Sequence, residues 1–264
     1  MDVAFREFGG RSLFLLTHGV PFEATRGTLL VPPFGEEMNR CRRFFLMLSQ
    51  NLARNGHFVT LADLSGTGDS AGELETVAWD EWVGEVERLI DFVAARTRGR
   101  ANLVAVRSGA LLAFEASCRS DFQVSSISLI DPVNDGSKFV NELLRLKLAA
   151  ALSSGARVNR TALWADWQAG RTVCVAGYRI PAKIALPLSS RSLSDFPLDP
   201  GIAVSIYQTG QGETGPSKSA PAGITLDVAV ENVIAPSWWR QTEPEPVPAL
   251  VEALVSNLAL EFAQ

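Results

Sequence analysis

Apolar runs short enough to be strands alternate with segments of helical spacing along the first half of the chain. Apolar residues lie at helical spacing from Glu36 to Asn55 and from Trp79 to Arg96. Strands that alternate with helices form βαβ units, in which parallel neighbours are joined by a crossover helix. We therefore predict an α/β fold with a mostly parallel central sheet flanked by helices. The runs taken as strands are Ser12–His18, Gly27–Val31, His57–Asp63, Asn102–Val106 and Ser126–Asp131.

The alternation stops for about 65 residues and then resumes. Residues 135–199 contain a helical stretch, Phe139–Leu152, and two tryptophans. Strand patterns return at Ile202–Tyr207 and Ile224–Val230, separated by a polar loop, Gly210–Gly223, and the chain closes on a helix, Pro248–Phe262. We predict one core made of residues 1–134 and 200–264, with residues 135–199 inserted as a helical lid.

The charge and cysteine content exclude several function classes. A formal net charge of −5 argues against a nucleic-acid partner, which requires a basic surface. Cys41, Cys118 and Cys174 are scattered without a C-x-x-C pair, so we expect no disulfide framework and no metal site. We expect no cofactor. The sequence contains no apolar stretch long enough to span a membrane, and its first residues do not resemble a secretory signal. We expect a cytoplasmic protein.

One turn carries the strongest functional signal. The strand Asn102–Val106 runs through Arg107, Ser108 and Gly109 directly into a helix, and such a turn lies at the carboxyl edge of a parallel sheet, where ligands bind. In α/β-hydrolases this turn is the G-x-S-x-G nucleophile elbow. One register puts Arg107 at the nucleophile position between the small residues Ala105 and Gly109. A shift by one residue puts Ser108 there instead.

Arg107 cannot act as a nucleophile because its guanidinium group stays protonated. At the start of a helix it would add a positive charge to backbone N–H groups that already favour an anion. The alternative is that Arg107 forms an ion pair with a neighbouring carboxylate and holds the loops together. Glu36 and Glu37 leave a similar choice, because acids stabilise a helix start but one of them is also placed to pair with Arg107.

The other parts of a hydrolase site are incomplete in this sequence. Backbone N–H groups of Phe34 or Gly35 and of Ser108 match the positions of an oxyanion hole. The acid should follow Ile202–Tyr207, where the nearest carboxylate is Glu213, and the histidine should follow the last strand, where none occurs. The chain has two histidines, His18 and His57, both in its first quarter. Asp131, at the end of a strand on the same edge, is an alternative acid.

Tryptophans after the last strand and in the insertion form a second candidate feature. Trp238 and Trp239 would line an apolar pocket beneath the lid together with Trp164 and Trp167. Large aromatic residues also seal a lid against a sheet, and the sequence does not separate these two interpretations.

Three segments resemble a known family. Pro33–Arg43 resembles a P-F-x-E-E-M-N-x-x-R-R pattern, Asp63–Gly72 resembles D-L-x-G-x-G-D-S-x-G, and Val106–Ala113 resembles L-R-x-G-x-L-L-A. These patterns are typical of the hydrolase 2 group associated with the exosortase A system, within the α/β-hydrolase superfamily. Two shorter matches, Leu144–Lys147 and Val175–Tyr178, resemble its lid region. This sequence departs from the family at Pro32, where a histidine is usual.

The resemblance implies the α/β-hydrolase fold, hydrolase chemistry, and a connection with exosortase, PEP-CTERM and exopolysaccharide proteins. Two functions follow from the residues and this resemblance. The first is hydrolysis or acyl transfer on an ester or thioester, with Ser108 as nucleophile and Asp131 in place of the usual partners. The second is non-catalytic binding of an anionic small molecule or acyl ligand by Arg107, with Phe34, Gly35, Glu36, Glu37 and Trp238 around it. A purely structural role in an assembly is a third possibility.

Overall fold

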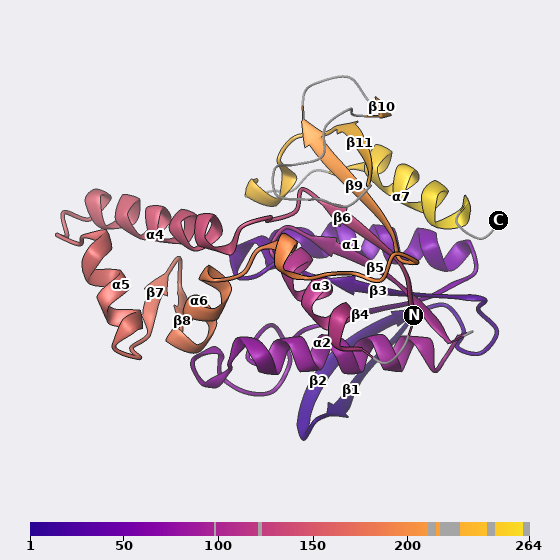
Figure 1. Ribbon diagram of the computed structural model, residues 1–264, viewed down its shortest axis with the longest axis horizontal. Coiled ribbons are helices and arrows are strands. Elements are labelled where there is room, and N and C mark those ends of the chain that lie inside the picture. Colours follow the sequence, from indigo (N-terminus) through magenta and orange to yellow (C-terminus); the bar gives the residue numbers. More distant parts are fainter. Residues whose placement is uncertain (98, 121–122, 211–214, 217–227, 242–245, 261–264) are drawn as a thin grey trace.

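The computed structural model describes residues 1–264 except 98, 121–122, 211–214, 217–227, 242–245 and 261–264 (Figure 1). Its centre is a nine-stranded sheet with strand order β1-β2-β4-β3-β5-β6-β9-β11-β10. Neighbours from β4 through β11 run parallel, while β1, β2 and β10 pair antiparallel at the two ends. The strands are β1 (Asp2–Phe8), β2 (Arg11–His18), β3 (Arg26–Val31), β4 (His57–Ala62), β5 (Arg100–Val106), β6 (Gln123–Ile130), β9 (Ala203–Gly210), β10 (Gly215–Pro216) and β11 (Ala229–Ile234).

Helices cover both faces of this sheet. On one face lie α1 (Glu36–Arg54) and α7 (Pro248–Leu260), and on the other lie α2 (Trp79–Ala94) and α3 (Gly109–Arg119) (Figure 1). The central strand β5 is buried along all but its first residue, which explains why it reads as a continuous apolar run rather than an alternating one. Short 3-10 helices complete the body: Leu74–Thr76, Leu193–Asp195 and Trp238–Arg240.

The insertion between β6 and β9 forms a separate layer that projects beyond the carboxyl edge of the sheet (Figure 1). It consists of α4 (Gly136–Ser153), α5 (Arg160–Gln168), the hairpin β7 (Val173–Val175) and β8 (Tyr178–Ile180), and α6 (Ala182–Ser189). Its two ends are held together, because the Gly136 amide donates to the Arg191 carbonyl over 2.9 Å and Asp135 pairs with Ser192. We call the layer from α4 to α6 the lid.

The predicted fold is confirmed, and the differences lie at the ends of the sheet and in the small elements β7, β8 and α6 of the lid. The sequence reading missed β1, a strand with mostly exposed side chains that pairs with β2. The last parallel strand was predicted at Ile224–Val230, but β11 begins at Ala229, and residues 217–227 lie outside the described part of the chain. Glu213 and most of the predicted loop Gly210–Gly223 also lie outside it. Within the described residues, no helix combines the length and the apolar character that crossing a membrane needs.

Candidate functional site

The turn after β5 has the backbone of a nucleophile elbow, and Arg107 occupies its apex. Arg107 has φ 52°, in the left-handed region that L-residues rarely adopt, and α3 begins two residues later at Gly109. A Cβ added to Gly109 would lie 2.6 Å from the Val31 carbonyl oxygen and 2.7 Å from that of Pro32. The close approach of the β3 loop therefore explains the small residue at position 109. Of the two registers, the backbone adopts the one with Arg107 at the elbow.

Ser108 lies one residue further on, in helical conformation and buried. Its Oγ accepts a hydrogen bond of 2.8 Å from the Phe34 amide, one of the two donors expected at an oxyanion hole. The Phe34 ring packs against Trp82 with 5.4 Å between ring centroids, and Gly35 follows it with φ 68° as the residue that caps α1. The Phe34 N–H group is thus bonded to the Ser108 hydroxyl group and does not point into an open oxyanion site.

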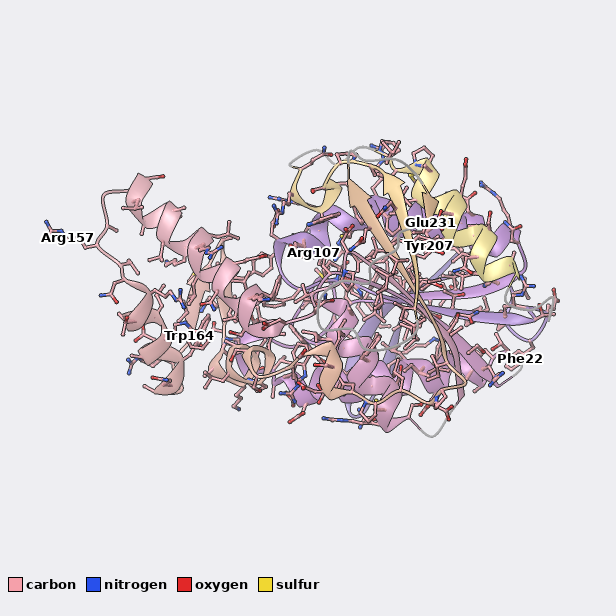
Figure 2. The ribbon with its side chains drawn as sticks, turned by 45° about the horizontal axis from the view of Figure 1, so that its top comes forward. Phe22, Arg107, Arg157, Trp164, Tyr207 and Glu231 are labelled. Carbon is pink, nitrogen blue, oxygen red and sulfur yellow. The ribbon has the colours of Figure 1, made fainter. Side chains whose placement is uncertain are left out.

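Arg107 lies where the lid meets the body (Figure 2). Its Nε donates to both oxygens of Glu37 over 3.3 and 3.4 Å, and one terminal nitrogen donates to the Asp131 carbonyl over 3.2 Å. The other terminal nitrogen lies 3.5 Å from Glu142 of α4. Strong guanidinium–carboxylate bonds measure about 2.7–2.9 Å, so all of these contacts are long. The pairing with Glu37 is the one that the sequence interpretation expected, whereas Glu36 contacts Arg40 and Tyr178.

Two carboxyl groups beside Arg107 have pKa values above their ordinary range. Burial raises the pKa of Glu37, and the nearby Arg107 only partly opposes this shift. Burial also raises the pKa of Asp131 from 3.8 to about 6, against hydrogen bonds from the Thr209 amide at 3.0 Å and the Thr209 hydroxyl at 2.9 Å. Asp131 has φ 42°, so its side chain is held in an uncommon backbone conformation at the carboxyl end of β6.

Residues at the ends of β9 and β11 complete the surroundings of Asp131 and Arg107. Thr209 lies at the end of β9 and holds Asp131. Trp239 follows β11, and the Arg107 guanidinium carbon lies 5.4 Å from its ring centroid, within cation–π range. Both tryptophans of this segment are buried, but Trp238 packs against Phe44 at 4.6 Å between centroids, while Trp239 lines a cavity.

Both histidines lie at the opposite edge of the sheet. His18 pairs with Val59 near the start of β4, and His57 is the first residue of that strand. His57 Nδ1 lies 2.9 Å from the Thr28 hydroxyl, and burial lowers the His57 pKa to about 4. Both histidines therefore lie at the amino ends of the parallel strands. The turn that holds Arg107 lies at the carboxyl ends, a full strand length away.

Two adjoining cavities open around Arg107. The head cavity, about 400 Å³, is lined by Arg107 and mainly polar residues: Pro132, Val133, Asn134, Asp135, Lys138, Phe139, Glu142 and Ser192. The tail cavity, about 640 Å³, lies between the lid and the loops after β3 and β11 and is mainly apolar. Phe34, Gly35, Glu36, Glu37 and Trp239 line its body side, and Leu143, Leu146 and Ile180 line its lid side. Phe139 and Glu142 line both cavities and mark their boundary.

Of the residues predicted for the site, the structure brings most to one edge. Arg107, Ser108, Asp131, Phe34, Gly35 and Glu37 cluster there, whereas Trp238 is turned into the body core and Trp164 packs against Trp167 within the lid. Sequence reasoning missed Glu142 and Thr209 because nothing in their local sequence marks them. Trp239 was recognised only as one of four tryptophans. No cluster of His, Cys, Asp and Glu suited to a metal ion occurs among the described residues.

Comparison with solved structures shows that this is the α/β-hydrolase fold. Est1E from Butyrivibrio proteoclasticus with ferulic acid bound aligns with TM-score 0.72 and 12% identity over 99% of this chain and 100% of that one. Mouse α/β-hydrolase domain-containing protein 10 aligns with TM-score 0.59 and 14% identity, covering 98% and 97%. A thioesterase domain from the curacin biosynthetic pathway aligns with TM-score 0.56 and 18% identity, covering 98% and 99%. No protein-family model and no curated protein sequence matches the chain.

The raised pKa of Asp131 predicts a specific effect of pH on stability. Folding favours the protonated carboxyl, so this group contributes stability that is fully present below about pH 4 and is lost as the pH rises through 6. Asp131→Asn mimics the protonated form. We expect it to leave the free energy of unfolding unchanged at pH 4 and to raise it by about 1–3 kcal/mol at pH 8. Urea unfolding at both pH values measures this difference, and an equal effect at the two pH values would exclude the titration of Asp131 as its cause.

Proposed function

We propose that this chain binds a small amphipathic anion without turning it over, with the anionic group at Arg107 and the apolar part in the tail cavity. The observation that carries the proposal is the state of Arg107. It stands at the elbow with only 12% of its side chain exposed, and each of its carboxylate and carbonyl contacts is 3.2 Å or longer. A guanidinium group has five N–H donors. An anionic ligand that accepts hydrogen bonds of about 2.7–2.9 Å from them would be bound more strongly than the groups that now contact Arg107.

The cavities define the chemical class of the ligand. Lys138 and Ser192 line the head cavity with Arg107, and Lys138 lies 3.8 Å from Asp135. A carboxylate, phosphate or sulfonate group would take the place of Glu142 beside Arg107. The tail cavity accommodates a hydrocarbon or aromatic portion, and its volume lies within the roughly 300–1,000 Å³ of small-molecule sites. Glu142, at the boundary, has 47% of its side chain exposed and can rotate into solvent when an anion replaces it. The similar fold of Est1E holds ferulic acid, an aromatic carboxylic acid, which supports a ligand of this kind.

Hydrolysis or acyl transfer on an ester or thioester is the second candidate function. Asp131 favours it, because a carboxyl group whose pKa is about 6 has the acidity expected of a general base near neutral pH. In that mechanism Ser108 would be the nucleophile. Two observations favour non-catalytic ligand binding instead. The Ser108 hydroxyl group already accepts a hydrogen bond from the Phe34 amide, and both histidines lie at the edge of the sheet opposite to Arg107. Loss of turnover in Ser108→Ala would support hydrolysis, whereas loss of ligand affinity in Arg107→Ala supports binding.

The biological setting forms a further part of the proposal. The segments Pro33–Arg43 and Val106–Ala113, which resemble the exosortase-associated hydrolase group, supply the paired Glu37 and Arg107. On this basis we propose that the protein works with exosortase, PEP-CTERM or exopolysaccharide proteins. A cytoplasmic location is part of the same proposal, since all three cysteines are free thiols.

Titration calorimetry with chain-matched ligands tests the binding function. Octanesulfonate carries a permanent negative charge, and octan-1-ol has the same chain without it. We expect octanesulfonate to bind with 1:1 stoichiometry and at least about tenfold more tightly than octan-1-ol, as a charge-assisted contact provides. Equal affinity for the two ligands would show that Arg107 does not select the anionic group.

A further inference from the structure

The insertion that contains the lid carries a charge opposite to that of the rest of the chain. Residues 135–199 contain nine Lys and Arg against five Asp and Glu, a net charge of +4, whereas the remaining residues carry −9. The bias is strongest in residues 143–165, which contain four basic residues and no acidic one. An electrostatic asymmetry of this size orients the molecule in the field of a charged surface, with the lid toward negative charge.

The same stretch of chain also carries two exposed leucines, both on α4. Leu152 has 80% of its surface exposed and Leu146 has 57%. Arg157 stands at the outermost point of the lid and points away from the body (Figure 2). Among the described residues, none of the four basic side chains forms an ion pair. We call this surface the lid tip; its residues are Arg145, Leu146, Lys147, Leu152, Arg157 and Arg160.

We propose that the lid tip docks on an anionic lipid surface. Arg145, Leu146, Lys147 and Leu152 lie on α4, and Arg157 and Arg160 follow in the connection to α5 and at its start. Basic residues interleaved with exposed apolar side chains are typical of segments that lie in a membrane interface. The head groups of anionic lipids attract each Lys or Arg, and the leucines insert among the acyl chains. The body, with its charge of −9, is held away from the same surface, so the lid makes the contact.

The position of Leu146 connects docking with the tail cavity. Leu146 is both part of the lid tip and part of the lining of that cavity. An amphipathic molecule leaving the lipid layer therefore reaches the apolar cavity along α4 without crossing the acidic surface of the body. This connection rests on the proposed function, but docking itself does not require Arg107.

Vesicle co-sedimentation tests the docking. The probes are vesicles of phosphatidylcholine alone and vesicles in which roughly a third of the lipid is phosphatidylglycerol, at low and physiological salt. We expect binding to the anionic vesicles only, weakened by salt. Arg157→Glu/Arg160→Glu is expected to lower the vesicle partition coefficient at least about tenfold, since each basic residue near such a surface contributes roughly fivefold. Leu152→Ser is expected to lower it severalfold at both salt concentrations.

Matched controls come from the body. Arg43→Glu reverses an exposed charge on α1, and Val20→Ser removes an exposed apolar side chain after β2; both are expected to leave partitioning within twofold of the unmodified chain. Absence of binding to anionic vesicles, or equal loss in the control variants, would overturn the docking. So would a lid-tip variant that changes the oligomeric state in solution, because the surface would then face a second copy. Octanesulfonate binding by the lid-tip variants is expected to persist, which separates failure of docking from failure of the proposed function.

Discussion

Arg107→Ala is expected to lower the affinity for octanesulfonate roughly 10- to 100-fold, the equivalent of the 1.5–3 kcal/mol that a hydrogen bond to a charged group contributes. The guanidinium group is the one side chain that lines the head cavity at the elbow and also contacts Trp239 of the tail cavity wall. Its removal leaves Glu37 buried without its nearest cation, so we expect the pKa of Glu37, which burial already raises, to rise further. Titration calorimetry at pH 7 measures the change.

Two variants control this result. Arg107→Lys keeps the charge but loses the planar pair of donors, so we expect an intermediate affinity. Glu142→Gln removes the negative charge that lies 3.5 Å from Arg107 and competes with the ligand, so we expect a severalfold higher affinity. Unchanged affinity in Arg107→Ala, with the variant folded, would remove Arg107 from the binding site.

Gly109→Ala is expected to destabilise the protein by about 2–3 kcal/mol, which corresponds to a fall in Tm of about 5–10 °C. The new Cβ would lie 2.6 and 2.7 Å from the carbonyl oxygens of Val31 and Pro32, and these are backbone atoms that move only if the end of β3 moves with them. The same shift displaces Phe34 from Ser108, so octanesulfonate affinity is expected to fall as well. Thermal unfolding followed by circular dichroism measures the first effect.

Gly84→Ala is the matched control for this substitution. Gly84 lies within α2, and a Cβ there would meet only the flexible end of the Arg88 side chain, at 3.2 Å. Alanine is the better helix former by about 0.8–1.0 kcal/mol, so Tm is expected to stay constant or to rise slightly. If both glycine variants lost the same stability, the close packing of the elbow against the β3 loop would not be the cause.

The core of the fold was predictable because its strands are buried on both faces. Runs such as Leu103–Val106 are apolar throughout and end at a turn, and the helices between them have clear periodicity. The edge strand β1 was not predictable in this way, because its side chains are mostly exposed and its register depends on pairing with β2. The small lid elements β7, β8 and α6 are likewise too short to show a period.

The candidate site was predictable only where the chain is locally constrained. The small residues Ala105 and Gly109 favoured the register with Arg107 at the apex over the one with Ser108, and the positive φ of Arg107 agrees with that register. The partner Glu37 was one of two alternatives, and only the fold distinguishes it from Glu36 by directing it toward Arg107. Thr209 and Glu142 reach the site from strands and helices distant in sequence, so their roles depend on tertiary packing that no local pattern encodes.

The crystal structure of the complex with octanesulfonate tests the central claim most directly. We expect sulfonate oxygens within about 3 Å of the Arg107 guanidinium nitrogens, with Glu142 rotated away and the octyl chain between Phe34 and Leu143. A sulfonate bound elsewhere, with the contacts of Arg107 to Glu37 and Glu142 unchanged, would contradict it.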